Sequence, residues 1–227
     1  AEIIVNVFNF ILSANADTPV ADVQEFCVEQ DVEFISNDLI PLVTSSKGGL
    51  KRIQEIVAGL KVFTHQSDNE LKIIDINKCI EHAFKLVENE LKYNYDVALN
   101  LTNDLYVIGN YVQLEQVFVN LFVNAKQAMP DGGKLIVDSG FNTNGNIYIK
   151  VSDTGCGIAK TNLDKLFTPF YTTKPVGVGT GLGLSISYGI IKDHQGEITV
   201  ASEEDKGTTF TIVIPAAKAP DNLGATN

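Results

Sequence analysis

Hydrophobic residues recur along the chain in two different patterns, and the first covers its amino-terminal part. From Val32 to Thr64 they recur every three or four positions, the spacing of a helix that buries one face in a coiled-coil-like bundle. These positions are Ile35, Leu39, Leu42, Leu50, Ile53, Val57 and Leu60. Residues 1–14 are a second, shorter helix candidate, and Asp17-Thr18-Pro19 separates the two. Because two helices bury too little apolar surface alone, we expect a hairpin that forms a four-helix homodimer through residues 1–66.

After residue 69, short segments in which apolar and polar residues alternate are interspersed with amphipathic helices. Strands are predicted at residues 72–76, 97–101, 105–108, 134–139, 147–152, 197–201 and 208–214, and helices at 77–92, 111–129 and 182–193. Asn77 is the expected cap of the first helix, and residues 155–180 are predicted to be mostly loop. Since no regular βαβ repeat appears, the fold class is α+β: a helical hairpin over residues 1–68, an α/β sandwich over 69–216 and a loose tail over 217–227.

Composition and charge exclude some classes of function. The chain has 17 Lys and Arg against 28 Asp and Glu, a net charge of −11, which argues against a nucleic-acid partner. Backbone amides can still hold phosphates on an acidic protein. Three separated cysteines fit a reducing cytoplasm. The apolar run at residues 3–12 is shorter than the roughly 20 residues of a membrane span. We therefore expect a cytoplasmic fragment that does not itself contact a membrane. It can still be the cytoplasmic part of a longer, membrane-anchored protein.

The helix predicted at 111–129 carries two stripes. Its apolar stripe consists of Leu114, Val117, Phe118, Leu121, Phe122 and Ala125, and its second stripe of the neutral amides Gln116, Asn120, Asn124 and Gln127. A solvent-facing stripe is usually charged, so the amides are either an unusual solvated face or a ligand-facing one. An Asn side-chain oxygen is a neutral ligand suited to Mg²⁺ that also binds substrate phosphates.

Two glycine-containing segments add candidate chemistry. In VSDTGCGIA, residues 151–159, a strand ends at Asp153, whose carboxylate can accept a hydrogen bond from the exocyclic amine of a base. In GVGTGLGLS, residues 177–185, four alternate glycines precede a helix, and together they can present backbone N–H groups and a helix dipole to an anion. A flexible turn is the alternative. The strand that precedes a Rossmann glycine loop is missing, and so is the GK[ST] of a Walker loop.

Four segments, taken in chain order, resemble the motifs of the ATP-binding domain of sensor histidine kinases. This domain belongs to a superfamily shared with gyrase, mismatch-repair ATPases and ninety-kilodalton heat-shock chaperones. They are NLFVNAKQAMPDGG, DTGCG, FTPFYTTK and GTGLGLS. The resemblance covers about residues 70–215. The segment NAKQAMPDGGKL most resembles the nitrogen-regulation-type subfamily, and LKRIQEIVAGLKVFT resembles the second helix of the dimerisation and phosphotransfer domain of that subfamily.

The resemblance implies ATP and Mg²⁺ as cofactors and assigns residues to them. Asn124 corresponds to the Mg²⁺ ligand, with Asn120 and Gln127 near the phosphates. The adenine end is assigned to Asp153, Gly155, Gly157, Ile158 and Thr208. The triphosphate is assigned to Gly179, Thr180, Gly181, Leu182, Gly183 and Leu184. Residues 158–180 correspond to a mobile lid that makes Lys174 available to the γ-phosphate.

Asn120 stands at the position that separates branches of this superfamily. The ATP hydrolases place there, four residues before the Mg²⁺ ligand, a Glu that activates water. An Asn cannot act as that base, which disfavours an ATP hydrolase. A histidine kinase needs no such base, because imidazole is itself a nucleophile near neutral pH.

The acceptor histidine of the family is missing from its expected place. The three histidines are His65, His82 and His194, which are interpreted as surface or structural residues. One register places Ala1 at the acceptor position and Glu2 at that of its helper acid. The alternatives are an acceptor upstream of residue 1 and an engineered change. The sequence thus predicts a histidine kinase core that supplies an Asp of a response regulator, or else a degenerate kinase that acts as a nucleotide-binding scaffold.

Overall fold

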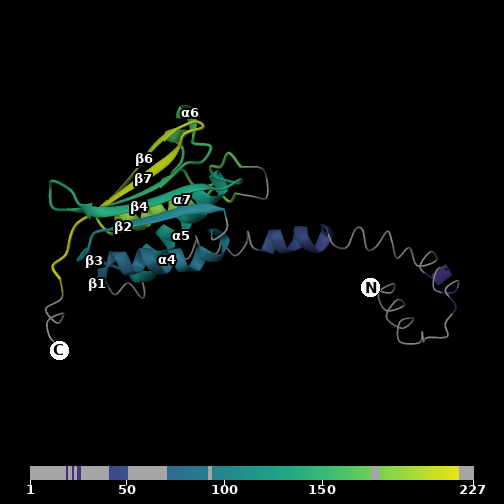
Figure 1. Ribbon diagram of the computed structural model, residues 1–227, viewed down its shortest axis with the longest axis horizontal. Helices are drawn as coiled ribbons and strands as arrows, with labels where there is room; N and C mark the ends of the chain where they lie inside the picture. Colours follow the sequence, from purple (N-terminus) through teal and green to yellow (C-terminus); the bar gives the residue numbers. More distant parts are fainter. Residues whose placement is uncertain are drawn as a thin grey trace. The chain divides into compact units, whose positions relative to one another are not determined.

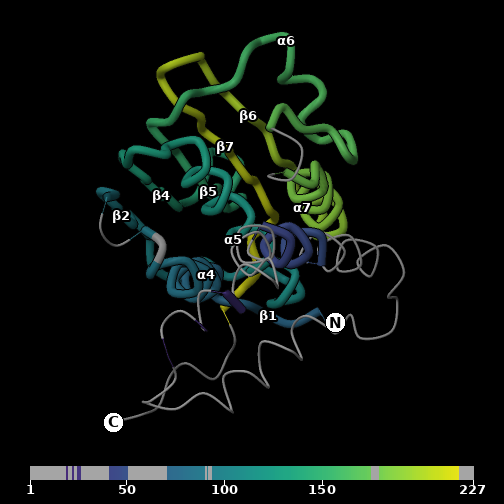
Figure 2. Tube along the Cα trace, turned by 90° about the vertical axis from the view of Figure 1, so that its right-hand side faces the viewer, coloured from purple at the N-terminus to yellow at the C-terminus, as the bar shows by residue number. Residues whose placement is uncertain are grey.

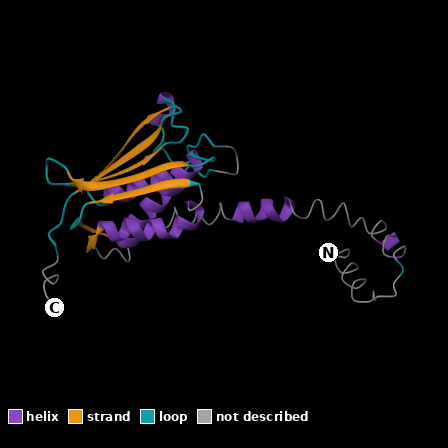
Figure 3. Ribbon diagram, in the orientation of Figure 1, coloured by secondary structure: helices purple, strands orange, loops and turns teal. Residues whose placement is uncertain are grey.

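The computed structural model describes residues 71–91, 94–174 and 179–219, together with residues 41–50 and positions 19, 22, 25 and 26. The chain divides after Gln54 into two units, each of which is described by itself. In the first unit, residues 41–50 are helical, as the periodicity predicts (Figure 3). Apart from positions 19, 22, 25 and 26, the rest of the predicted hairpin, with Ala1, Glu2 and His65, lies outside the described residues.

The second unit mixes helices and strands as expected (Figure 1). Its elements in chain order are β1 (Lys72–Asp75), α4 (Ile76–Leu91), β2 (Tyr95–Leu101), β3 (Tyr106–Gly109), α5 (Tyr111–Ala128), β4 (Gly133–Phe141), β5 (Ile147–Asp153), α6 (Lys160–Leu163), α7 (Gly183–Asp193), β6 (Glu197–Glu203) and β7 (Gly207–Ile214). Five strands form one sheet in the order β2-β4-β5-β7-β6, and β1 pairs with β3 in a small antiparallel sheet. The α/β sandwich is therefore confirmed.

Helices α4, α5 and α7 form a layer on one face of the five-stranded sheet (Figures 1 and 2). Helix α5 packs against both other helices and against β5 and β7. All six residues of its predicted apolar stripe are buried. The Asn110 side chain caps its start by accepting a hydrogen bond from the Gln113 N–H at 3.1 Å. The apolar stripe thus fixes which side of α5 is left for polar chemistry.

Two local expectations differ from the structure. Helix α4 begins at Ile76, one residue before the expected cap Asn77, because the Asp75 carboxylate accepts hydrogen bonds from the N–H groups of Asn77 at 3.1 Å and Lys78 at 3.4 Å. We expected a loose tail from residue 217, but its first residue is hydrogen-bonded to the domain: the Ala217 N–H donates to the Tyr106 carbonyl oxygen at 2.6 Å. Residues 220–227 lie outside the described residues.

The buried His194 joins the end of α7 to the start of α5. Its Nδ1–H donates to the Ile190 carbonyl oxygen at 2.7 Å, and its Nε2 accepts from the Asn110 N–H at 2.9 Å. Both nitrogens of a neutral ring are therefore satisfied by backbone, which confirms the structural reading of His194. A Cβ built at Gly109 would lie 2.6 Å from the ring Cδ2, so only glycine leaves room for this ring.

We predict that Gly109→Ala destabilises the protein by about 1–3 kcal/mol, because the added methyl group displaces the His194 ring. Urea unfolding followed by circular dichroism measures the effect. In Gly109→Ala/His194→Ala the clash partner is gone, so the double variant should lose less than the sum of the single losses. Additive losses would show that Gly109 and His194 act independently.

Candidate functional site

The polar stripe of α5 faces the start of α7. The Asn120 Nδ2 donates to the Gly183 carbonyl oxygen at 3.3 Å and to the Ser187 Oγ at 3.4 Å. Ser187 is fully buried, and its hydroxyl donates to the same Gly183 oxygen at 2.9 Å. The side-chain amide of Asn120 therefore holds the first turn of α7 against α5. Sequence reasoning missed Ser187, although two serines in an otherwise apolar helix were a visible signal.

One turn further along α5, two amides hold the ammonium group of Lys174. Its Nζ donates to the Asn124 Oδ1 at 3.2 Å and to the Gln127 Oε1. Burial lowers the pKa of Lys174, and the neighbouring Cys156 partly opposes that shift. The predicted amide stripe thus faces a cation rather than bulk solvent.

This donor set also fits Mg²⁺ at Asn124. Neutral side-chain oxygens are acceptable ligands for an ion that keeps several waters and binds nucleotide phosphates. The ammonium of Lys174 shows that these oxygens point to a common position and accept a positive charge there. Among the described residues, no group of three or more His, Cys, Asp or Glu could hold a metal by itself.

A second cluster surrounds Asp153 at the end of β5. Its buried carboxylate accepts hydrogen bonds from the backbone N–H groups of Gly155, at 2.9 Å, and Thr208. Burial raises the pKa of Asp153, and these two hydrogen bonds partly lower it again. Asp153 and Thr208 are register partners on β5 and β7, so the sheet brings them together. The Cys156 N–H donates to the Ala128 oxygen at 3.0 Å and ties this loop to the end of α5.

Ser202 connects the strand pair β6–β7 to the segment after Gly157. Its Oγ accepts from the Ile158 N–H at 2.9 Å and lies 2.9 Å from both the Gly207 oxygen and the Thr208 Oγ1. Sequence reasoning assigned Ile158 and Thr208 to one end of a ligand but missed Ser202. Its signal was the pairing of β6 with β7, which places Ser202 opposite Thr208.

The glycines of both motifs are required mainly by the chain itself. A Cβ at Gly155 would lie 2.6 Å from Ala128, one at Gly157 2.0 Å from the Glu203 oxygen, and one at Gly181 2.4 Å from the Phe170 backbone. A Cβ at Gly179 would lie 2.6 Å from the Thr172 Oγ1. Gly183 is different, because its nearest protein neighbour would be an Asn120 atom at 3.7 Å. Among the described glycines of the two motifs, Gly183 is therefore the one at which the described protein atoms leave room for a ligand to approach the backbone.

The structure thus forms two clusters from the predicted residues. Asn120, Asn124, Gln127, Lys174 and Gly183 meet along α5, and Asp153, Gly155, Gly157, Ile158 and Thr208 meet at the end of β5. Thr180 accepts a hydrogen bond from the Leu182 N–H at 3.4 Å, and Leu182 is buried while Leu184 packs against the core. Residues 175–178 lie outside the described residues.

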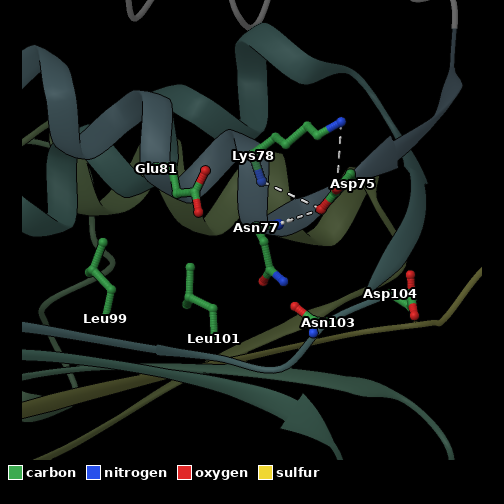
Figure 4. A pocket seen from close by; sticks show the side chains of 8 residues that line it. All are labelled: Asp75, Asn77, Lys78, Glu81, Leu99, Leu101, Asn103 and Asp104. Atoms are coloured by element: carbon green, nitrogen blue, oxygen red, sulfur yellow. Dashed lines mark hydrogen bonds and ion pairs between the residues drawn. The ribbon is translucent and has the colours of Figure 1, made fainter.

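An open cleft of about 530 Å³ lies elsewhere, at the start of α4 beside β2 (Figure 4). It is lined by Asp75, Asn77, Lys78, Glu81, Leu99, Leu101, Asn103 and Asp104, none of them a residue of either cluster. Asp75 already caps α4 and pairs with Lys78. The cleft therefore adds nothing to the candidate site.

This fold and these motifs define the class of protein. The family described as histidine kinase-, DNA gyrase B-, and HSP90-like ATPase matches residues 109–218. The catalytic domain of histidine kinase ThkA is 34% identical with a TM-score of 0.58, and the match covers 64% of this chain and 97% of that domain. The chain therefore belongs to this ATPase family, in its histidine kinase branch.

Particular relatives are sensor kinases. Sporulation kinase E of Bacillus subtilis is 37% identical over 73% of this chain and 22% of its own length, and sensor histidine kinase ZraS of Escherichia coli K12 is 36% identical over 72% and 35%. The chain thus spans at most about a third of these relatives. ThkA in complex with the response regulator TrrA is 25% identical, with a TM-score of 0.60 over 95% of this chain. In the described part of the chain, no helix is long and apolar enough to cross a membrane.

We predict that Asp153→Asn reduces discrimination between ATP and inosine triphosphate, which carries an oxygen in place of the exocyclic amine. The carboxylate is held as an acceptor by two N–H donors, whereas an amide presents either an oxygen or an NH₂ group. Calorimetric affinities for both nucleotides should converge by about tenfold, or 1.4 kcal/mol. Asp138→Asn, on the same sheet, is the control. Unchanged discrimination in Asp153→Asn would remove Asp153 from base recognition.

Proposed function

We propose that this chain is the kinase core of a sensor histidine kinase, which binds Mg-ATP and transfers the γ-phosphoryl group to a histidine. The main observation that supports this proposal is that the side-chain amide oxygens of Asn124 and Gln127 converge on one cation, the Lys174 ammonium. Close to these oxygens lies Gly183, where an added Cβ would meet no described protein atom closer than 3.7 Å. In this proposal the triphosphate lies between α5 and the start of α7, and the base lies at Asp153.

Asn124 would hold the Mg²⁺, which supplies charge stabilisation on the phosphate oxygens. The chain's own residues bind and orient the nucleotide. Asn120 fixes the start of α7, where N–H groups favour an anion. Asp153 accepts the base amine, with Ile158 and Thr208 held beside it through Ser202. Lys174 lies within reach of the same amides and would meet the γ-phosphate.

The reaction follows from the absence of a base at position 120. The Asn120 Nδ2 already donates to Gly183 and Ser187, and an amide cannot remove a proton from water. A histidine nitrogen can attack the γ-phosphorus directly. The new N–P bond replaces the bond from phosphorus to the bridging oxygen, ADP leaves, and a helper acid such as Glu2 accepts the imidazole proton.

From the same resemblance we also propose the domain arrangement of the kinase, the place of its acceptor histidine and its partner. Residues 1–68 form the dimerisation hairpin, residues 69–216 the ATP-binding domain, and the acceptor histidine stands at the position of Ala1, upstream, or on a partner chain. The phosphoryl group then passes to an Asp of a response-regulator receiver domain. The similarity to ThkA, whose structure includes a response regulator, supports this partner class.

We predict that incubation with Mg²⁺ and γ-³²P-labelled ATP labels Ala1→His but not the unmodified chain. The phosphorylated product should be labile to acid and stable to alkali, as expected for phosphohistidine. Ala1→Gln is the control for a change of side chain without a nucleophile. Label on the unmodified chain would assign the acceptor to His65, His82 or His194. Nucleotide binding without any label would favour an upstream acceptor or the nucleotide-binding scaffold.

We predict that Gly183→Ala weakens Mg-ATP binding by about tenfold, or 1.4 kcal/mol, while the protein stays folded. The added methyl group would meet no atom of the described residues closer than 3.7 Å, so we expect it to interfere with a ligand that approaches this backbone. Gly189→Ala is the matched control, because it lies in the same helix with nothing within 4 Å. Calorimetry measures affinity and thermal unfolding measures stability. Equal affinities of the two variants would place the triphosphate elsewhere.

A further inference from the structure

The cation position on α5 is filled by a residue of the chain. Lys174 reaches it from a segment 47 positions away from Gln127 along the sequence. Its Nζ donates to the Asn124 Oδ1 at 3.2 Å and also to the Gln127 Oε1. Lysine side chains usually extend into solvent, so a partly buried ammonium between two amides is unusual.

The surroundings of this ammonium make it easy to displace. Asn124 and Gln127 carry no formal charge, and no salt bridge of the described residues includes Lys174. A partly buried charge held only by neutral acceptors has lost part of its hydration without gaining a counter-ion. A divalent ion that arrives with its own phosphate ligands therefore has an energetic advantage over the lysine at this position.

The backbone beside Lys174 connects it to the second glycine motif. The Lys174 N–H donates to the Thr172 Oγ1 at 3.1 Å. A Cβ at Gly179 would lie 2.6 Å from that same oxygen and 3.2 Å from the Lys174 Cβ. Departure of the Lys174 side chain from α5 thus removes a contact that holds this part of the chain beside Asn124.

We propose that Lys174 is an internal cation that occupies the Mg²⁺ position of the nucleotide-free protein and is exchanged for Mg²⁺ when the metal–nucleotide complex binds. This inference rests on the proposed function of the site. In this exchange the amide oxygens always have a positive partner, the Lys174 ammonium before the nucleotide binds and Mg²⁺ afterwards. The exchange also releases Lys174 toward the phosphates only after the metal has entered, so metal binding and lysine recruitment occur in a fixed order.

Nitrogen-detected NMR of lysine ammonium groups tests the exchange on the whole chain. We expect one ammonium signal protected from water exchange in the nucleotide-free protein, absent in Lys174→Met and present in Lys165→Met. Lys165 is an exposed lysine of the same region, which makes it a matched control. Addition of Mg-ADP, which lacks the γ-phosphate, should abolish the protection, whereas Mg²⁺ alone at the same concentration should not.

A titration measures the competition separately. The ratio of the ADP dissociation constant without Mg²⁺ to that with Mg²⁺ should rise at least about fivefold in Lys174→Met, because the competing ammonium is gone. Lys165→Met should match the unmodified chain. A protected ammonium that persists in Mg-ADP, or an unchanged ratio in Lys174→Met, would overturn the exchange while nucleotide binding stands. Failure of the unmodified chain to bind ADP or ATP would overturn the proposed function itself.

Discussion

The division of α5 into a buried face and a polar face is the constraint on which the rest of this unit depends. Its apolar residues fill the space between the sheet and the helices α4 and α7, and this packing leaves the helix no freedom to rotate. Asn120, Asn124 and Gln127 are therefore held on one line whether or not a ligand is present. A site built on a packed helix keeps its geometry more reliably than one built on loops.

Close backbone contacts help to fix the loops around that helix. Gly157 and Gly181 adopt positive φ angles of 68° and 67°, and both lie against backbone atoms of other segments. The cluster around Asp153 and the cluster along α5 are consequently shaped by different devices. The β5–β7 register sets Asp153 against Thr208, whereas tight glycine turns set the approach to α7. Both devices position backbone N–H groups before a ligand arrives, which is the form of preorganisation that favours electrostatic binding.

Much of this arrangement follows from local sequence signals, and the rest does not. The stripes of α5 and the hairpins β4–β5 and β6–β7 could be predicted, because periodicity and turn residues act over short distances. The parallel pairing of β2 with β4 could not, since it joins residues such as Asn100 and Asp138 that lie 38 positions apart. The contact of Lys174 with Gln127, 47 positions apart, and the hydrogen bond from the Ile158 N–H to Ser202, 44 positions apart, were missed for the same reason. The glycine pattern indicated close approach correctly, but only the structure shows that most of the neighbours are protein atoms.

The absence of carboxylates from the polar stripe of α5 connects its binding properties to its reactivity. A carboxylate at position 124 or 127 would form an ion pair with the Lys174 ammonium, which the neutral amides do not. A carboxylate at position 120 would also supply a base for water, and would face the Gly183 carbonyl oxygen that Asn120 now satisfies as a donor. Neutral amides avoid both outcomes. If the proposed function holds, the same choice of residue type that would let Mg²⁺ replace the ammonium at Asn124 would also leave the terminal phosphate without an activated water, so that its transfer would require a nucleophile from another part of the protein.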